Sequence, residues 1–230
     1  MLFDLKKKKT DKPRRTRTIG KDLDFASVEA YNLLRTNLSF ALPDVDGGKA
    51  IGITSPCPQE GKSTTSVNLA YALAEAGHKV ILIDADLRRP SLGKVVDVPT
   101  VPGLSNLLVD ENVQGAIHEG VLHQNLTMLL SGNIPPNPSE LVGSERMKNF
   151  IDGLRKTYDY VIVDLPPVNA VSDPLAASKH IDGMIVVVRH GHTKRKELIE
   201  TIRQLELVNA KVFGFVYNGI YKTKPNYSKN

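Results

Sequence analysis

The segment from Ala50 to Gly77 constrains the fold more than any other part of the sequence. A short apolar stretch, Ala50 to Thr54, has the composition of a buried strand. It runs into the loop Ser55 to Thr64 and then into a helix predicted over Ser63 to Ala76, which Gly77 ends. A strand, a loop with Gly-Lys-Ser-Thr and a helix in this order indicate a loop that holds the phosphates of a nucleotide.

The residues of this loop have the chemistry that a triphosphate requires. Gly61 lets the backbone come close, Lys62 supplies a point charge for the outer phosphates, and Ser63 offers its hydroxyl to Mg²⁺. Because Pro56 and Pro58 have no N–H, the backbone donors are expected from Gln59, Glu60, Gly61, Lys62, Ser63 and Thr64. The usual pattern has glycine at the position of Pro56, and the alternative interpretation is a surface lysine at a helix start. We expect ATP and Mg²⁺ as the bound groups.

Two further apolar strands end in carboxylates. Val80 to Asp84 is followed by Asp86, and Tyr160 to Asp164 ends in an acid of its own. A carboxylate at a buried strand end is costly unless a cation or hydrogen bonds compensate it, and Lys62 with Mg²⁺ would do so. We therefore expect Asp164 and Asp86 at the metal. The alternative for a single strand-end acid is a helix or loop cap.

Two arginines, Arg88 and Arg89, come directly after these acids. One guanidinium can neutralise charge that develops on a transferred phosphoryl group. The alternative is an ion pair with Asp84 or Asp86. The sequence leaves both interpretations open.

The rest of the chain alternates strands with helices. A helix is predicted over Phe25 to Phe40, and further strands and helices follow residue 125: Leu126 to Leu130, a helix starting at Asn137-Pro138-Ser139-Glu140, helical Pro174 to Lys179, Met184 to Val188, helical Lys196 to Val208, and Val212 to Tyr217. Residues 85–125 are expected to be irregular with short helical stretches. This order predicts an α/β domain of the P-loop NTPase type, with a mainly parallel central sheet and helices on both faces. Ligands should bind beyond the carboxyl ends of the strands.

The charge is concentrated at one end of the chain. Residues 1–17 hold eight Lys or Arg and two Asp, a net of +6, so the remainder sums to 5 − 6 = −1. We expect a basic flexible arm over residues 1–20, a domain over 21–220 and a flexible tail over 221–230. The arm is either simply solvated or attracted to an anionic membrane face. No aromatic residues interleave with these charges, so nucleic acid is not expected as a partner.

The remaining composition bears on the compartment. A single cysteine, Cys57, excludes an internal disulfide and a Cys-cluster metal site. No apolar run is long enough for a membrane-spanning helix, and no signal peptide is recognisable. We expect a cytoplasmic protein.

Taken together, these segments resemble the bacterial tyrosine kinases, or BY-kinases. The resemblance rests on four stretches in order: Ser55 to Thr64, Ile83 to Pro90, Asn137 to Leu141, and Tyr158 to Pro167. More specifically, the chain is similar to the cytoplasmic autokinase that regulates capsular or extracellular polysaccharide synthesis and chain length. The resemblance implies a membrane-bound chain-length regulator as activator, a position at the inner face of the cell membrane through that partner, and a cognate tyrosine phosphatase.

The resemblance also implies roles for individual residues. Lys62, Ser63, Asp84, Asp86 and Asp164 match the family's nucleotide and acidic motifs, and Asn218 matches an asparagine that faces the adenine. Asp84 is expected as the base that takes the tyrosine proton and Asp86 as the organiser of the metal's water shell, although the two roles can be exchanged.

Assembly and phosphorylation sites follow from the same resemblance. Family members form rings through a Glu-x-x-Arg-x-x-Arg helix, which is represented here by Glu29 and Arg35, with Asn32 at the middle position. Family members carry a dense tyrosine cluster in the tail, whereas this chain offers Tyr221 and Tyr227 as the expected phosphoacceptors. These departures leave open the ring size and the alternative of an ATP-gated scaffold. A partition-type ATPase switch is a further alternative, but its signature lysine is replaced by Cys57.

Overall fold

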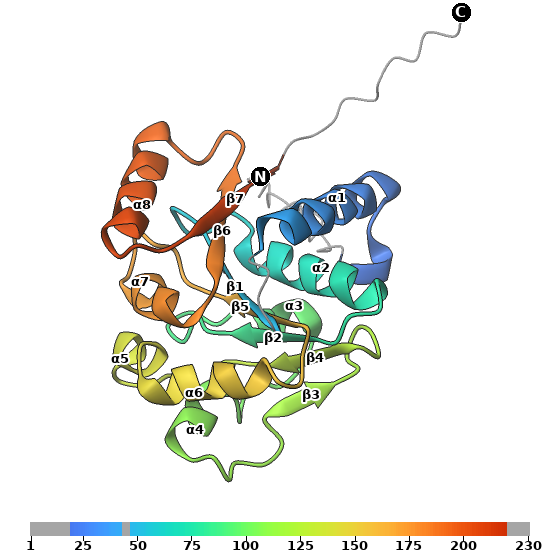
Figure 1. The fold of residues 1–230 in the computed structure, drawn as a ribbon, viewed down its shortest axis with the longest axis vertical. Coiled ribbons are helices and arrows are strands. Elements are labelled where there is room, and N and C mark those ends of the chain that lie inside the picture. The colour runs from blue at the N-terminus through green and yellow to red at the C-terminus, as the bar shows by residue number, and fades with distance from the viewer. Residues whose placement is uncertain (1–18, 43–46, 220–230) are drawn as a thin grey trace, which may run out of the picture.

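A computed structural model describes residues 19–42 and 47–219. Its centre is a seven-stranded sheet with the strand order β3-β4-β2-β5-β1-β6-β7, covered by helices on both faces (Figure 1). The predictions for the N-terminal arm up to residue 18 and for the tail tyrosines Tyr221 and Tyr227 lie outside the described residues.

The sheet is parallel except at one edge. Its parallel members are β1 (Lys49–Thr54), β2 (Val80–Asp84), β4 (Leu126–Leu129), β5 (Tyr160–Asp164), β6 (Gly183–Arg189) and β7 (Val212–Asn218). The short edge strand β3 (Ile117–Glu119) is antiparallel to β4 and was not expected from the sequence. Since all the parallel strands point the same way, their carboxyl ends meet at one edge, as the predicted fold class requires.

The helices divide between the two faces. On one face lie α1 (Phe25–Ala41), α2 (Lys62–Glu75) and α3 (Leu92–Val96). On the other lie α4 (Leu104–Val109), α5 (Pro138–Val142), α6 (Glu145–Leu154), α7 (Asp173–Ala177) and α8 (Arg195–Leu207). Two short 3₁₀ turns, Gly20–Asp22 and Ser178–His180, complete the set among the described residues. Figure 1 shows α1 and α2 together on one side of the sheet.

Alternating side chains of the strands feed two separate cores. On β2, Val80 and Leu82 pack into the core beneath α1, α2 and α3, whereas Ile81 and Ile83 pack into the core beneath the other helices. All four are completely buried. A strand covered on both faces needs apolar residues at every position, which is why the sequence shows no polar alternation there.

The region between α5 and α6 differs from the sequence-based expectation. The predicted helix start at Asn137 is confirmed, because α5 begins at Pro138, but this helix ends at Val142. Ser144 then caps a second helix, α6, by accepting a hydrogen bond from Met147 N–H at 3.2 Å. The capping serine gives the backbone an alternative to continuing the first helix.

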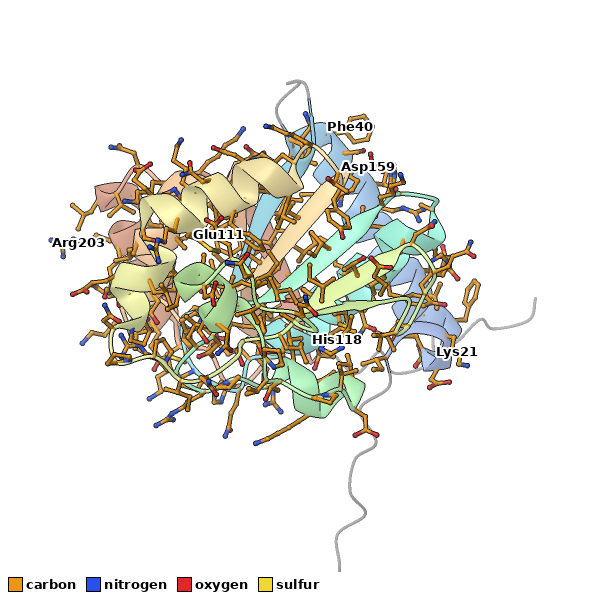
Figure 2. The ribbon with its side chains drawn as sticks, turned by 90° about the horizontal axis from the view of Figure 1, so that it is seen from below. Lys21, Phe40, Glu111, His118, Asp159 and Arg203 are labelled. Carbon is orange, nitrogen blue, oxygen red and sulfur yellow. The ribbon has the colours of Figure 1, made fainter. Side chains whose placement is uncertain are left out.

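The predicted helix at Phe25 is confirmed, and its last turn has Leu38 in the core on one side and Phe40 in solvent on the other. Phe40 is 85% exposed and points away from the sheet in Figure 2, as does Arg203 on α8. Among the described residues, none of the helices combines the length and the apolar character needed to span a bilayer.

Candidate active site

The predicted acids meet at the carboxyl edge of the sheet. β2 and β5 are neighbours, and Asp84 and Asp164 are register partners at their ends. The phosphate loop follows β1, which pairs with the other side of β5. A cleft of about 810 Å³ opens here, lined by residues of the phosphate loop, of the segment after β2, of the loop after β5, and by Arg189 from β6. The prediction that Asp84 and Asp164 lie close together beside the loop is confirmed.

The phosphate loop has a backbone shape that exposes its N–H groups. Gln59 has φ +64° and Gly61 has φ +97°, both in the left-handed region. α2 starts at Lys62, so the N–H groups of its first turn have no acceptor within the helix. Gln59, Gly61, Lys62, Ser63 and Thr64 all line the cleft. This geometry suits an anion at a helix N-terminus.

The loop is fastened to the segment that follows β6. The buried Glu60 carboxylate accepts a hydrogen bond from Cys57 N–H at 3.0 Å and another from the Thr193 hydroxyl. Arg189 donates to Gln59 O at 2.9 Å. Glu60 therefore points away from the cleft and holds the loop in place, whereas the sequence suggested it only as a source of a backbone N–H.

Asp164 has the properties of a metal-facing carboxylate. It is 1% exposed, and Ser66 donates to its Oδ1 at 2.9 Å. Its Oδ2 has no hydrogen-bond partner within the described part of the chain. Burial raises the pKa of Asp164 to about 6, against the effect of the Lys62 ammonium, which lowers it.

These features fit Mg²⁺. A buried carboxylate oxygen with no partner beside a lysine-bearing phosphate loop is a suitable neighbour for a hard cation. In residues 19–42 and 47–219, no three His, Cys, Asp or Glu side chains gather into a metal cage. A cation here would therefore depend on Ser63, on nucleotide oxygens and on water, as is usual for Mg²⁺.

Asp84 and Asp86 occupy different environments. Asp84 is completely buried, and its two oxygens accept hydrogen bonds from the N–H groups of Asp86 and Leu92, each at 3.2 Å. Burial, and then the charge of Asp164, raise its pKa well above the usual range. Asp86 lines the cleft, and burial raises its pKa as well. The cleft therefore presents Asp86 rather than Asp84 to a ligand.

Ser63 has a partner that the sequence did not indicate. Its hydroxyl shares a hydrogen bond of 2.7 Å with Ser91, the residue before α3. Ser91 also lines the cleft. Because the segment after β2 was expected to be irregular, no sequence signal pointed to Ser91.

Arg88 forms an ion pair, but with a different acid from those proposed. Its Nε lies 3.0 Å from Asp173 Oδ2 and its Nη2 lies 3.0 Å from Asp173 Oδ1. The expected pair with Asp84 or Asp86 is wrong for Arg88, because its side chain extends toward α7. The helix predicted over Pro174 to Lys179 begins one residue earlier, because Asp173 is the first residue of α7. Asp173 lies 85 positions from Arg88 in the sequence, so no local pattern pointed to this pair.

The remaining predicted residues lie in defined places. Asn218 Nδ2 donates to Glu60 O at 2.9 Å, next to the cleft, so the expected contact with adenine stays a prediction. Arg35 donates to Ala72 O at 2.8 Å, and Asn32 donates to Glu29 at 3.2 Å. Both pairs lie within one chain, and the ring itself stays a prediction.

The fold and this site define a nucleotide-binding domain of the P-loop class. Residues 49–212 match the family model described as AAA domain. The chain is 36% identical to the tyrosine-protein kinase YwqD of Bacillus subtilis, with 86% of this chain and 88% of that protein covered. It is 32% identical to the kinase domain of Escherichia coli tyrosine kinase Etk, a solved structure, with a TM-score of 0.79 and with 88% of this chain and 80% of that one covered. The chain therefore belongs to the family of bacterial tyrosine-protein kinases.

Family members differ in length. The chain is 37% identical to the tyrosine-protein kinase Ptk of Acinetobacter johnsonii over 90% of its own residues, but it spans 28% of that protein. The shared unit is thus the P-loop domain, which stands nearly alone in YwqD and is one part of Ptk.

Proposed function

We propose that this chain transfers the γ-phosphoryl group of ATP to protein tyrosine, including Tyr221 and Tyr227 of a second copy. One observation carries the proposal: Lys62 of the phosphate loop and the cleft-lining carboxylate Asp86 lie beside the buried Asp164 at the same edge of the sheet. This combination holds a triphosphate and leaves an acid free for the acceptor.

The phosphate loop would bind the phosphates, and the acids at the strand ends would bind the metal. The N–H groups from Gln59 to Thr64 surround the phosphates, and Lys62 draws charge from the outer ones. When bound, Mg²⁺ would neutralise charge on the phosphates, and Ser63 and Asp164 are the residues that would hold it. Most of the rate is then expected from positioning and electrostatics, as in other phosphoryl transfers.

Proton removal from the acceptor is assigned to the acidic pair after β2. In the transfer, the bond from the γ-phosphorus to the bridging oxygen breaks, and a bond to the tyrosine oxygen forms. The tyrosine proton, with a pKa near ~10 in water, passes to a carboxylate. Of the two roles that the sequence left exchangeable, Asp86 suits the base because it reaches the cleft, and Asp84 suits its support because both its oxygens accept backbone N–H groups.

The physiological role follows from the family. We assign the chain to the control of capsular or extracellular polysaccharide synthesis and chain length, together with a membrane-bound regulator that activates it. It would then act at the inner face of the cell membrane through that partner, as a homo-oligomeric ring, with a tyrosine phosphatase reversing the modification.

The test is mass spectrometry of the purified chain after incubation with Mg-ATP, with and without a cytoplasmic peptide of a candidate activator. We expect phosphate on Tyr221 or Tyr227, and none in a Lys62→Met variant that unfolds at the wild-type temperature. Free phosphate without phosphotyrosine would favour the partition-type switch instead. Unchanged polymer output in a Tyr221→Phe/Tyr227→Phe strain would favour an ATP-gated scaffold.

A further inference from the structure

Asp173 is a completely buried carboxylate that binding of the nucleotide does not explain. Its side chain is 0% exposed, whereas the Arg88 side chain that pairs with it is 41% exposed. A buried charge is costly, and pairs of this kind often stabilise less than apolar residues of the same size. The cost of burying Asp173 therefore indicates a role for the pair other than stability.

Asp173 and Ser139 hold Arg88 through two of its guanidinium nitrogens. Nε donates to both Asp173 oxygens, at 3.0 and 3.3 Å, and Nη2 donates to Asp173 Oδ1 at 3.0 Å. Nη2 also donates to Ser139 Oγ at 3.1 Å, and Ser139 itself donates to Asp173. Arg88 is thus tied to both α5 and α7, which pack against each other (Figure 1).

The arrangement leaves one end of the guanidinium available. Among the hydrogen bonds of the described residues, none is made by Arg88 Nη1. Arg88 nevertheless lines the cleft together with Lys62 and Asp86. Because the guanidinium is planar, hydrogen bonds that hold Nε and Nη2 in place also fix the direction of Nη1.

The order of strands shows which part of the cleft this arginine serves. Arg88 follows β2, and Arg189 ends β6, and these strands lie on opposite sides of β5 and β1. Arg189 is engaged by the phosphate loop at Gln59 O. Arg88 therefore lies on the side of Asp86 and Asp164, where the outermost phosphate and the acceptor would meet.

We propose that Arg88 is a catalytic residue that stabilises the transferring phosphoryl group through Nη1, and that Asp173 and Ser139 are positioning residues for it. The inference rests on the kinase reaction proposed above. Arg88 neither gives nor takes a proton. It offers positive charge to the phosphoryl oxygens as the bond to ADP breaks and the bond to tyrosine forms.

The test compares conservative variants of Arg88 and Asp173 with a variant of a similar ion pair that lies away from the cleft. Arg155 and Asp182 form a similar two-bonded pair, at 2.8 and 3.0 Å. This pair lies at the amino end of β1, where Asp182 also accepts from Ala50 N–H. Arg155→Lys is therefore the control for loss of a partly buried pair away from the cleft.

We expect Arg88→Lys and Asp173→Asn to lower kcat for tyrosine phosphorylation by about 100-fold, with the Kd for ATP changed by less than about threefold. Affinity for ADP with aluminium fluoride, which imitates the phosphoryl group in transfer, should fall in parallel with kcat, while affinity for ADP alone stays. Ethylguanidinium should partly restore kcat to Arg88→Ala but not to Asp173→Asn. Arg155→Lys should lower the unfolding temperature and leave all these constants unchanged.

Retained kcat in both variants, with only a lower unfolding temperature, would show that the pair is structural and overturn the inference. A loss of ATP affinity with unchanged kcat would also overturn it, because Arg88 would then bind the ground state. A wild-type chain that forms no phosphotyrosine contradicts the proposed function instead. In that case the aluminium fluoride measurement still tests Arg88.

Discussion

At the scale of single residues, Gly61 joins two requirements at one position. Its φ of +97° favours glycine, and a Cβ there would meet Asn218 Nδ2 at 2.0 Å. Either the loop or the amide of Asn218 must move when a side chain is added. The glycine of the phosphate loop therefore serves its contact with the end of β7 as well as the approach of the nucleotide.

Replacing this glycine should weaken nucleotide binding. We expect Gly61→Ala to raise the Kd for Mg-ATP at least about tenfold, which corresponds to about 1.4 kcal/mol, measured by titration with a fluorescent nucleotide. Gly77→Ala is the matched control, since Gly77 has φ +94° but a Cβ there meets nothing within 4 Å. Equal effects of the two changes would mean that backbone strain alone, and not the Asn218 contact, matters.

Asp164 carries a second prediction at this scale. Its carboxylate is buried beside Asp84, whose pKa its charge raises, and burial raises the pKa of Asp164 itself, with the charge of Asp86 adding to this. We expect Asp164→Asn to stabilise the nucleotide-free chain, on the order of 1 kcal/mol, and to abolish the added stability that Mg-ATP confers on the wild type. Thermal unfolding with and without Mg-ATP measures both effects. A variant that Mg-ATP still stabilises fully would contradict the assignment of Asp164 to the metal.

At the scale of elements, the parallel strands and the helices α1, α2, α7 and α8 were predicted well, whereas α6 and the edge strand β3 were not. The ends of β1, β2 and β5 agree with the sequence because buried parallel strands leave uninterrupted apolar runs. The short helices α3 and α4 lie in the region expected to hold short helical stretches, but their bounds were not predicted, and neither was the break between α5 and α6. Helices of five or six residues have too few turns to show a periodic pattern, so packing rather than sequence decides them.

The segment between α7 and β6 holds a buried histidine, from which we expect a pH-dependent stability. His180 is 6% exposed, and its ring nitrogens have no hydrogen-bond partner in the part of the chain that the structure describes. Burial lowers its pKa below the usual 6.5, and Lys179 adds to this. The nearby Gly143 backbone and the acids Glu145 and Asp152 of α6 oppose it.

The sign of the effect follows from which state binds the proton. Below about pH 6.5 the unfolded chain protonates this histidine and the folded chain does not, so stability falls as the pH falls. Between pH 7 and 5.5, the free energy of unfolding should decline less in a His180→Gln variant than in the wild type, as measured by urea unfolding. The exposed His190→Gln is the control. A variant with the wild-type slope would mean that other groups cause the decline.

At the scale of the whole molecule, α1 presents exposed apolar side chains on the helix through which we propose that copies assemble. Phe25, Leu33 and Phe40 on this helix are 82, 61 and 85% exposed. Glu29 is bonded to Asn32, and Arg35 is bonded to the end of α2. Asn32, at the middle of the family's assembly pattern, thus holds the Glu29 carboxylate. That carboxylate would otherwise be available to another copy.

Restoring the pattern should strengthen the proposed ring. We expect Asn32→Arg to raise the average molar mass in light scattering at a fixed protein concentration, by releasing Glu29 and adding the missing cation. Asn37→Arg adds the same charge to another side of α1, since five residues correspond to about 140° of helix rotation, and should leave the mass unchanged. Equal masses for wild type and Asn32→Arg would contradict assembly through this helix.

The sequence by itself determined the alternation of strands and helices, the phosphate loop, and the acids at the ends of β2 and β5. These features are local, because each depends on a short run of residues whose chemistry and burial are fixed by their neighbours. The tertiary structure decided which acid reaches the cleft, which acid holds Arg88, and how Glu60 fastens the loop to Thr193. Asp173 lies 85 positions from Arg88, and Thr193 lies 133 positions from Glu60. These two contacts form because the parallel strands bring their carboxyl ends to one edge of the sheet, so no local sequence pattern specifies them.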